Sequence, residues 1–247
     1  MPYEISVLGD RFLFFSLPSE SEIPKAVPGG KRCVILLPSL DADFRIVGYE
    51  KCGKPLCDYY SAAVCAAAHL TKIRGLPLPE ISFETPRGIL EIICTDDGFF
   101  SVNVDKCKVL LSKNITICDC YTDVADIDVH ATCRVMRLCD AARFDKKALK
   151  RLSSALLPLP HSVVLSSFDR DTLHVRTYTD YNPTPPSSIL MYAAAAYNEW
   201  FFSNCKISGK IFSFEKLSFC TVSYSAVCMT VKPNFVTKKI IYSDGIV

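Results

Sequence analysis

Hydrophobic and polar residues alternate in short runs along most of the chain. Runs of this length that are rich in Val, Ile and Phe and bounded by polar turns are typical of β-strands. The pattern predicts strands over residues 33–37, 81–84, 89–94, 99–104, 162–166, 173–178 and 220–231.

Two longer segments predict helices instead, over residues 58–74 and 188–203. Both are apolar nearly all round, which indicates helices buried in a core. Asp58 is placed to cap the first helix and Gly75 to end it. Ser187 or Ser188 is placed to cap the second helix. A third, amphipathic helix is predicted over residues 146–156.

The order of these elements repeats along the chain. Residues 36–50 match residues 165–179 at an offset of 129, and residues 59–73 match 188–202 at the same offset. The repeat predicts an α+β fold of two pseudo-symmetric halves, each a curved, mostly antiparallel sheet wrapped around one central helix. We expect the halves to span residues 1–117 and 118–247, with the C-terminal strand free to cross back to the first half.

Composition narrows the class of protein. The 247 residues are 49% hydrophobic and 22% charged with a net charge of +2, which favours neither nucleic acid nor a membrane as a partner. With no signal peptide or spanning segment, we expect a cytoplasmic protein. The odd count of thirteen cysteines indicates reduced thiols. The sequence contains no C-x2-C pair, the spacing that is typical of structural zinc sites.

Several short motifs resemble those of the diaminopimelate epimerase family, whose superfamily includes proline racemases and the phenazine-biosynthesis isomerase. Residues 7–12 stand at the family's G-N-D-F turn, 49–53 at its F-N-A-D-G segment and 85–88 at its T-x-x-G turn. In the second half, residues 175–181 stand at V-R-x-Y-E-R-G and 242–245 at the closing Y-D-G. The resemblance spans the whole chain and implies the epimerase fold without a cofactor.

The resemblance also implies where a site would lie. The family inverts an amino-acid α-carbon with two thiols, one at the N-terminus of each central helix. Those positions hold Tyr59 and Ser188 here, and neither hydroxyl is a base at neutral pH. The family's ligand-contacting positions, around a small amino-acid-like ligand in the interdomain cleft, match Asp10, Glu50, Tyr60, Ser61, His130, Ser162, Thr179 and Asp180.

Two functions follow from these substitutions. The first is a divergent, non-catalytic protein that binds a small molecule or a partner at the cleft, with a homodimer left open. The second is an active cofactor-independent isomerase, epimerase or dehydratase that uses Cys57, two residues before Tyr59. Asp58 beside Cys57 would raise the pKa of that thiol rather than lower it.

Overall fold

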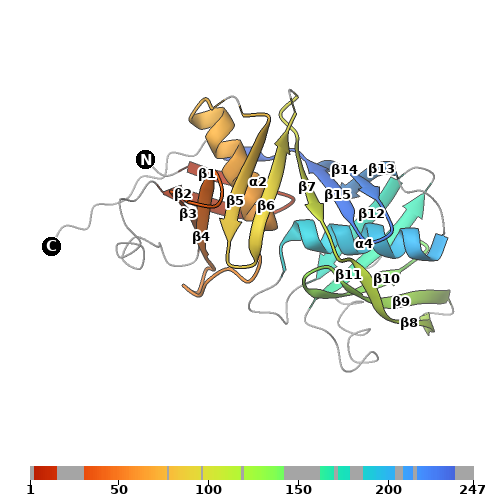
Figure 1. The fold of residues 1–247 in the computed structure, drawn as a ribbon. Helices are drawn as coiled ribbons and strands as arrows, with labels where there is room; N and C mark the ends of the chain where they lie inside the picture. The colour runs from red at the N-terminus through yellow and green to blue at the C-terminus, as the bar shows by residue number, and fades with distance from the viewer. Residues whose placement is uncertain are drawn as a thin grey trace.

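The computed structural model describes residues 3–15, 31–76, 78–95, 97–117, 120–141, 162–169, 172–178, 186–203, 208–213 and 216–236. Figure 1 shows two halves side by side, each with strands curled around one helix. The first surrounds α2 (Tyr60–Ala68) and its continuation η2 (His69–Ile73), a π-helical turn, and the second surrounds α4 (Ser188–Ser203). The predicted α+β architecture is therefore confirmed.

The described strands form one continuous hydrogen-bonded order that divides evenly between the halves. The first half holds β16 (Asn234–Val236), β1 (Tyr3–Val7), β2 (Asp10–Phe15), β3 (Arg32–Leu37), β4 (Phe44–Tyr49), β5 (Glu80–Thr85), β6 (Gly88–Cys94) and β7 (Phe100–Val104). The second holds β8 (Lys108–Ile117), β9 (Cys120–Asp128), β10 (Thr132–Arg137), β11 (Val163–Asp169), β12 (Thr172–Tyr178), β13 (Ser208–Ser213), β14 (Lys216–Val222) and β15 (Val227–Val231).

Strand directions repeat from one half to the other. In the first half, β2–β3 and β4–β5 are parallel and the other neighbours are antiparallel. In the second half, β10–β11 and β12–β13 are the parallel pairs, at equivalent places. This agreement is the three-dimensional form of the internal repeat.

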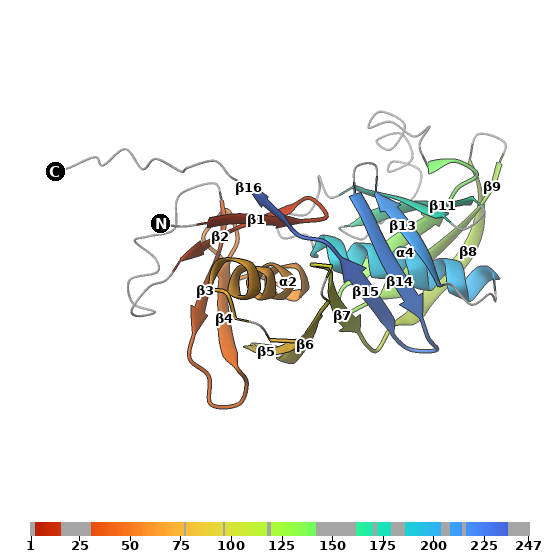
Figure 2. The ribbon, with the colours of Figure 1, turned by 90° about the horizontal axis from the view of Figure 1, so that it is seen from above.

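The chain passes between the halves twice, from β7 to β8 and from β15 to β16. β16 follows β15 along the chain but pairs with β1, as Figure 2 shows, and β8 follows β7 but pairs with β9. β8 lies on the N-terminal side of the division expected after residue 117, yet its partner strand is in the second half.

β7 and β15 join the two halves by antiparallel pairing, with Val102 opposite Met229. Next to this pair, the hydroxyls of Ser101 and Thr230 are hydrogen-bonded at 2.7 Å, and these residues are 129 positions apart. A residue can touch its own equivalent only near a two-fold axis. The seam between β7 and β15 therefore lies on the pseudo-two-fold axis of the molecule.

The core follows the sheets. One large cluster of buried side chains surrounds both helices, and all nine residues of α2 are buried. A smaller cluster includes Val163, Leu165 and Met136. Their strand neighbours Val164 and Val135 belong to the large cluster, and side chains alternate between faces along a strand. The sheet of the second half therefore buries apolar residues on both faces at β10 and β11.

Three expectations about individual elements need comment. The strand expected over residues 220–231 is wrong, because β14 and β15 are separate strands joined by a turn in which Ser223 N donates to Ala226 O at 2.8 Å. The first helix begins at Tyr60 rather than residue 58 and becomes π-helical at His69. The helical turn ends at Ile73, and Gly75 follows it with a φ of +68°, in agreement with the expected stop. The helix expected over residues 146–156 lies outside the described residues.

The seam gives a test of the pseudo-symmetric packing. Met229→Ala should lower the free energy of unfolding by about 2–5 kcal/mol because it leaves a cavity beneath β7. In a double-mutant cycle, Met229→Ala and Val102→Ala should couple by at least about 0.5 kcal/mol, as neighbours do. Met229→Ala and Leu165→Ala, from different clusters, should be additive. Urea denaturation measures all three, and an additive seam pair would contradict the packing.

Candidate functional site

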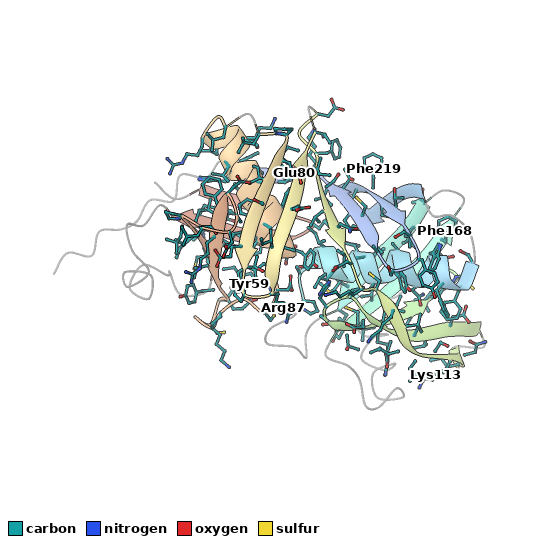
Figure 3. All side chains as sticks on the ribbon, in the orientation of Figure 1. Tyr59, Glu80, Arg87, Lys113, Phe168 and Phe219 are labelled. Atoms are coloured by element: carbon teal, nitrogen blue, oxygen red, sulfur yellow. The ribbon has the colours of Figure 1, made fainter. Side chains whose placement is uncertain are left out.

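The N-termini of α2 and α4 meet at the junction of the two halves. Tyr59 and Tyr60 at the start of α2, and Ser187 and Ser188 at the start of α4, are all buried. Figure 3 labels Tyr59 at the lower end of the first half. The positions that the sequence matches to the family's two thiols therefore do come to one junction, but the chain's own atoms cover them.

Asp58 does not cap its own helix, contrary to the sequence-based expectation. α2 has no side-chain cap, and Asp58 Oδ2 instead accepts a hydrogen bond from Ser187 N at 2.5 Å. Asp58 and Ser187 are 129 positions apart, the offset of the repeat. The carboxylate thus crosses the pseudo-two-fold axis and serves the opposite helix.

Asp10 supplies a second carboxylate to the same helix end. Its Oδ2 accepts a hydrogen bond from Ser188 N at 2.7 Å. Ser187 Oγ accepts from Leu190 N at 3.4 Å, which confirms Ser187 as the cap of α4. The amide groups of Ser187, Ser188 and Leu190 at the start of α4, which no intrahelical carbonyl can reach, therefore have acceptors from side chains of this chain.

Arg32 links the carboxylates into a network. Its Nη1 lies 2.7 Å from Asp10 Oδ1, and its Nε lies 2.8 Å from Glu50 Oε2. Burial works against the charged guanidinium, but the charges of Asp10 and Glu50 outweigh it and raise the pKa of Arg32. Three carboxylates and one guanidinium thus share the junction.

Local backbone geometry brings Glu50 and Asp58 to this place. Gly53 N donates to Glu50 O at 2.8 Å in a turn where Gly53 has a φ of +80°, a conformation that favours glycine. Leu56 then packs directly on Gly48, where an added Cβ would lie 2.3 Å from Leu56 Cδ1. This close contact holds the segment that carries Asp58 against β4.

Burial changes the acidity of the groups at the junction. The pKa of Asp58 is raised from 3.8 to about 6, first by burial and in part by the charge of Asp10, against the hydrogen bonds from Ser187 and the charge of Arg32. Asp58 Oδ1 has no hydrogen-bond partner within the described part of the chain. An ionised Asp58 is therefore costly here.

The thiols and phenols of the site are held protonated. Burial, followed by the charges of Asp58 and Glu50, raises the pKa of Cys57. Burial also raises the pKa of Tyr59 and of Tyr60. The pKa of Cys133, a buried thiol near Asp58, is raised to about 12. None of these groups is a base at neutral pH.

His130 lies at the edge of the junction rather than in the carboxylate network. Its Nε2 is 2.6 Å from Asp105 Oδ1, and its ring tilts against that of Tyr60 with centroids 5.6 Å apart. Arg87, on the turn after β5, donates to His130 O at 2.8 Å. His130 has a φ of +64°, an uncommon conformation for a residue with a side chain. These contacts tie β9–β10 to the first half.

The remaining sequence-predicted residues divide into two groups. Ser61 and Ser162 are buried, and within the described residues neither hydroxyl has a hydrogen-bond partner. Thr179 and Asp180 lie outside the described residues. Sequence reasoning missed Arg32, and it placed Asp58 only as a cap. A charged residue at the start of an otherwise apolar strand was the available signal for Arg32.

Other features limit the chemistry that the described residues offer. Ten cysteines in the described ranges form no disulfide with one another. The described residues contain no group of three or more His, Cys, Asp or Glu side chains arranged to hold a metal ion. Nor does any helix there have the length and apolarity needed to cross a bilayer.

Solved structures share this fold. A PhzF-family phenazine biosynthesis protein from Bacillus anthracis has a TM-score of 0.70 at 13% identity, covering 95% of this chain and 96% of that one. A probable proline racemase from Agrobacterium radiobacter, solved with bound carbonate, has a TM-score of 0.66 at 12% identity, covering 99% and 94%. A predicted epimerase from Pseudomonas aeruginosa has a TM-score of 0.66 at 11% identity, covering 98% and 99%.

These likenesses define the fold of the chain. The chain has the two-half fold of the diaminopimelate epimerase-like superfamily, as its sequence motifs predicted. No protein-family model and no curated protein matches the sequence. Identities of 11–13% establish the fold alone.

The buried carboxylate predicts how stability depends on pH. The folded state binds the proton of Asp58 more tightly than the unfolded state, so Asp58 makes the protein less stable as pH rises from about 4 to about 6. Asp58→Asn cannot lose this proton. Relative to wild type, it should gain stability across that range by up to about 3 kcal/mol and then level off.

Urea denaturation at pH 4, 5, 6 and 7 measures this difference. Asp43→Asn is a control whose stability should depend on pH in the opposite direction. Hydrogen bonds from Ser82 lower the pKa of Asp43, so the stability that ionised Asp43 contributes to wild type is lost as pH falls. A difference between Asp58→Asn and wild type that does not change with pH would contradict the environment described for Asp58.

Proposed function

We propose that this chain is a non-catalytic protein built on the epimerase fold, in which its own carboxylates fill the position that a ligand takes in the family. One observation carries the proposal: Asp58 and Asp10 already accept the hydrogen bonds of Ser187 N and Ser188 N at the start of α4. An anionic ligand would have to displace them.

The physical basis is the anion preference of a helix N-terminus. Amide groups without intrahelical partners and the helix dipole together favour a negative charge there. The probable proline racemase from Agrobacterium radiobacter was solved with bound carbonate, a small anion. In this chain, two aspartates supply that negative charge from within, at 2.5 and 2.7 Å from the amide nitrogens.

The residues available for proton transfer support the same proposal. Inverting an α-carbon requires a base on one face and an acid on the other. Tyr59 and Ser188 stand at the two positions, and burial raises the pKa of Tyr59. Cys57, the thiol of the competing proposal, is also held protonated by burial and by Asp58. Neither face has an evident thiolate.

The competing function is an active isomerase, and Asp58 is a better candidate for its base than any thiol of the site. Its pKa of about 6 is near the value that suits a general base at neutral pH. It stands one residue before the first thiol position. Its other neighbours argue against this role, because its Oδ2 is held by Ser187 N and the side chain is buried.

Solvent deuterium exchange separates the two functions. We expect no incorporation at the α-carbon of LL- or meso-diaminopimelate or of L-proline above the rate without protein. Exchange that is lost in Asp58→Asn or in Cys57→Ala would overturn the proposal and identify the base. Exchange that survives both changes would also overturn it and would direct attention to His130, with His130→Gln as the next variant.

A second experiment tests the filled anion position directly. In wild type, the backbone amide resonances of Ser187 and Ser188 should not move when acetate is added. In Asp10→Ala, one amide is released, and acetate should shift the Ser188 resonance in a saturable way. Glu4→Ala, which removes an acidic side chain from β1 away from α4, serves as the matched control. A wild-type response equal to that of Asp10→Ala would contradict the proposal.

A further inference from the structure

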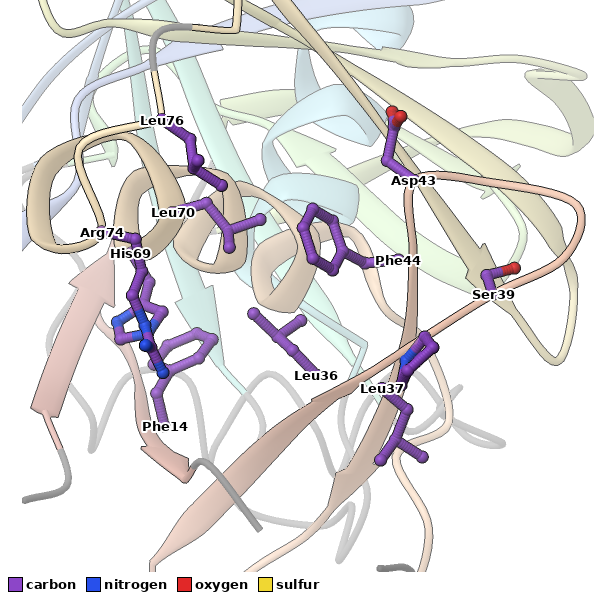
Figure 4. Close-up of a pocket in the computed structure, with 11 residues that line it drawn as sticks. Phe14, Leu36, Leu37, Ser39, Asp43, Phe44, His69, Leu70, Arg74 and Leu76 are labelled. Carbon is purple, nitrogen blue, oxygen red and sulfur yellow. The ribbon is translucent and has the colours of Figure 1, made fainter. Parts of the chain in front are cut away.

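Two features of the molecule lie away from the junction. One is a cavity of about 640 Å³ between η2 and strands β2, β3 and β4, with Phe14, Leu36 and Phe44 on its wall (Figure 4). The other is an exposed sheet face that crosses the seam between the halves. The strand register fixes the order of residues on this face, and that order identifies a partner for it.

One row of residues crosses five neighbouring strands of this face. Glu80 on β5 stands opposite Ile93 on β6, and Ile93 stands opposite Ser101 on β7. Across the seam, Ser101 is opposite Thr230 on β15, and Thr230 is opposite Phe219 on β14. Residues directly opposite each other in antiparallel strands project to the same face of the sheet. The five residues therefore form one continuous row.

The row faces away from the core and exposes apolar surface. Its strand neighbours Ile92 and Val102 are buried in the large core cluster, and side chains alternate between the faces of a strand. Ile93 is 53% exposed, and Ile89, on the same face of β6, is 50% exposed. Across the seam, Phe219 is only half-buried. Exposed apolar surface on both sides of the seam is typical of an interaction site.

The two ends of the row hold residues of opposite charge. Glu80 is exposed at the end in the first half. In the second half, Lys210 on β13 stands opposite Phe219 and is the next register position of the row. Figure 3 labels Glu80 in the first half and Phe219 in the second. Because the pseudo-two-fold axis passes through the seam, Glu80 and Lys210 occupy equivalent places in the two halves.

We infer that this face binds a second copy of the chain, in a dimer whose two-fold axis runs along the seam. In this arrangement, the row of one chain lies over the row of the other in reverse order. Glu80 of one copy then faces Lys210 of the other, and Ile93 faces Phe219. Two sheets that pack in this way have nearly aligned strands and lie about 10 Å apart, which is the common geometry of stacked sheets.

Charge decides between the two ways in which this face could pair with itself. Because the face is pseudo-symmetric, a dimer axis across the strands would give a contact of similar shape. That axis would place Glu80 against Glu80 and Lys210 against Lys210, and like charges opposed across an interface are unfavourable. An axis along the seam instead joins unlike charges at both ends of the row. Each such pair occurs twice, because a two-fold contact uses the same surface of both copies.

Sedimentation velocity measures the dissociation constant of the dimer. Wild type should be dimeric at micromolar protein concentration. Ile93→Asp should raise the dissociation constant at least about 100-fold, because it places two charges in the apolar part of the contact. Leu111→Asp is the matched control. Leu111 is 52% exposed on the edge strand β8, away from the seam, so its replacement should leave the dissociation constant unchanged.

Charge reversal tests the direction of the dimer axis. Glu80→Lys and Lys210→Glu should each raise the dissociation constant about 10-fold, because both end pairs then join like charges. Mixed in equal amounts, the two variants should form a heterodimer with the wild-type dissociation constant, because each end pair again joins an acid to a base. Lys113→Glu, which reverses an exposed lysine on β8, is the control and should change neither the homodimer nor the mixture.

Three results would overturn the inference: a monomeric wild type, a dimer that withstands Ile93→Asp, or a mixture of the charge variants that associates as weakly as either variant alone. Loss of the dimer in Leu111→Asp but not in Ile93→Asp would place the contact at the edge of β8 and would also overturn it. Recovery in the mixture requires both variants to be folded, so misfolding cannot imitate it. These results are independent of α-proton exchange, so failure here leaves the proposed function of the junction unaffected.

Discussion

Two helix N-termini face each other at the centre of this molecule, and their positive ends must be balanced. The first amide groups of a helix have no intrahelical acceptors, and burial at the junction denies them water. Asp58 and Asp10 provide the acceptors for α4, and Arg32 in turn balances Asp10 and Glu50. At the start of α4, the acceptors for Ser187 N and Ser188 N are thus carboxylates of the chain itself.

The sheets hold this arrangement in place. Because β16 returns to the first half and β8 pairs within the second, the chain crosses the junction in both directions. The pairing of β7 with β15 adds a continuous ladder between the halves. Such connections restrict the relative movement of the halves, and they keep Asp58 within hydrogen-bonding distance of Ser187 on the opposite helix.

Duplication accounts for the similarity of the halves, but equivalent positions in the two halves differ in their side chains and contacts. At the junction, the backbone N–H of Ser187 donates a hydrogen bond to the carboxylate of its repeat equivalent, Asp58. At the far ends of the helices, the ring of Trp200 packs against Tyr197 in the second half, whereas a cavity lies beside His69 in the first half.

Sequence alone determined the fold class, the repeat, the two buried helices and the positions that meet at the junction. These depend on hydrophobic periodicity and on the spacing of short motifs, which are local properties of the chain. It could not determine that Asp58 serves α4 instead of its own helix, because a capping residue has the same local pattern whichever helix it reaches. Nor could it place Arg32 between Asp10 and Glu50, residues 22 and 18 positions away. Those contacts are between residues distant in sequence, and only the packing of the two halves brings them together.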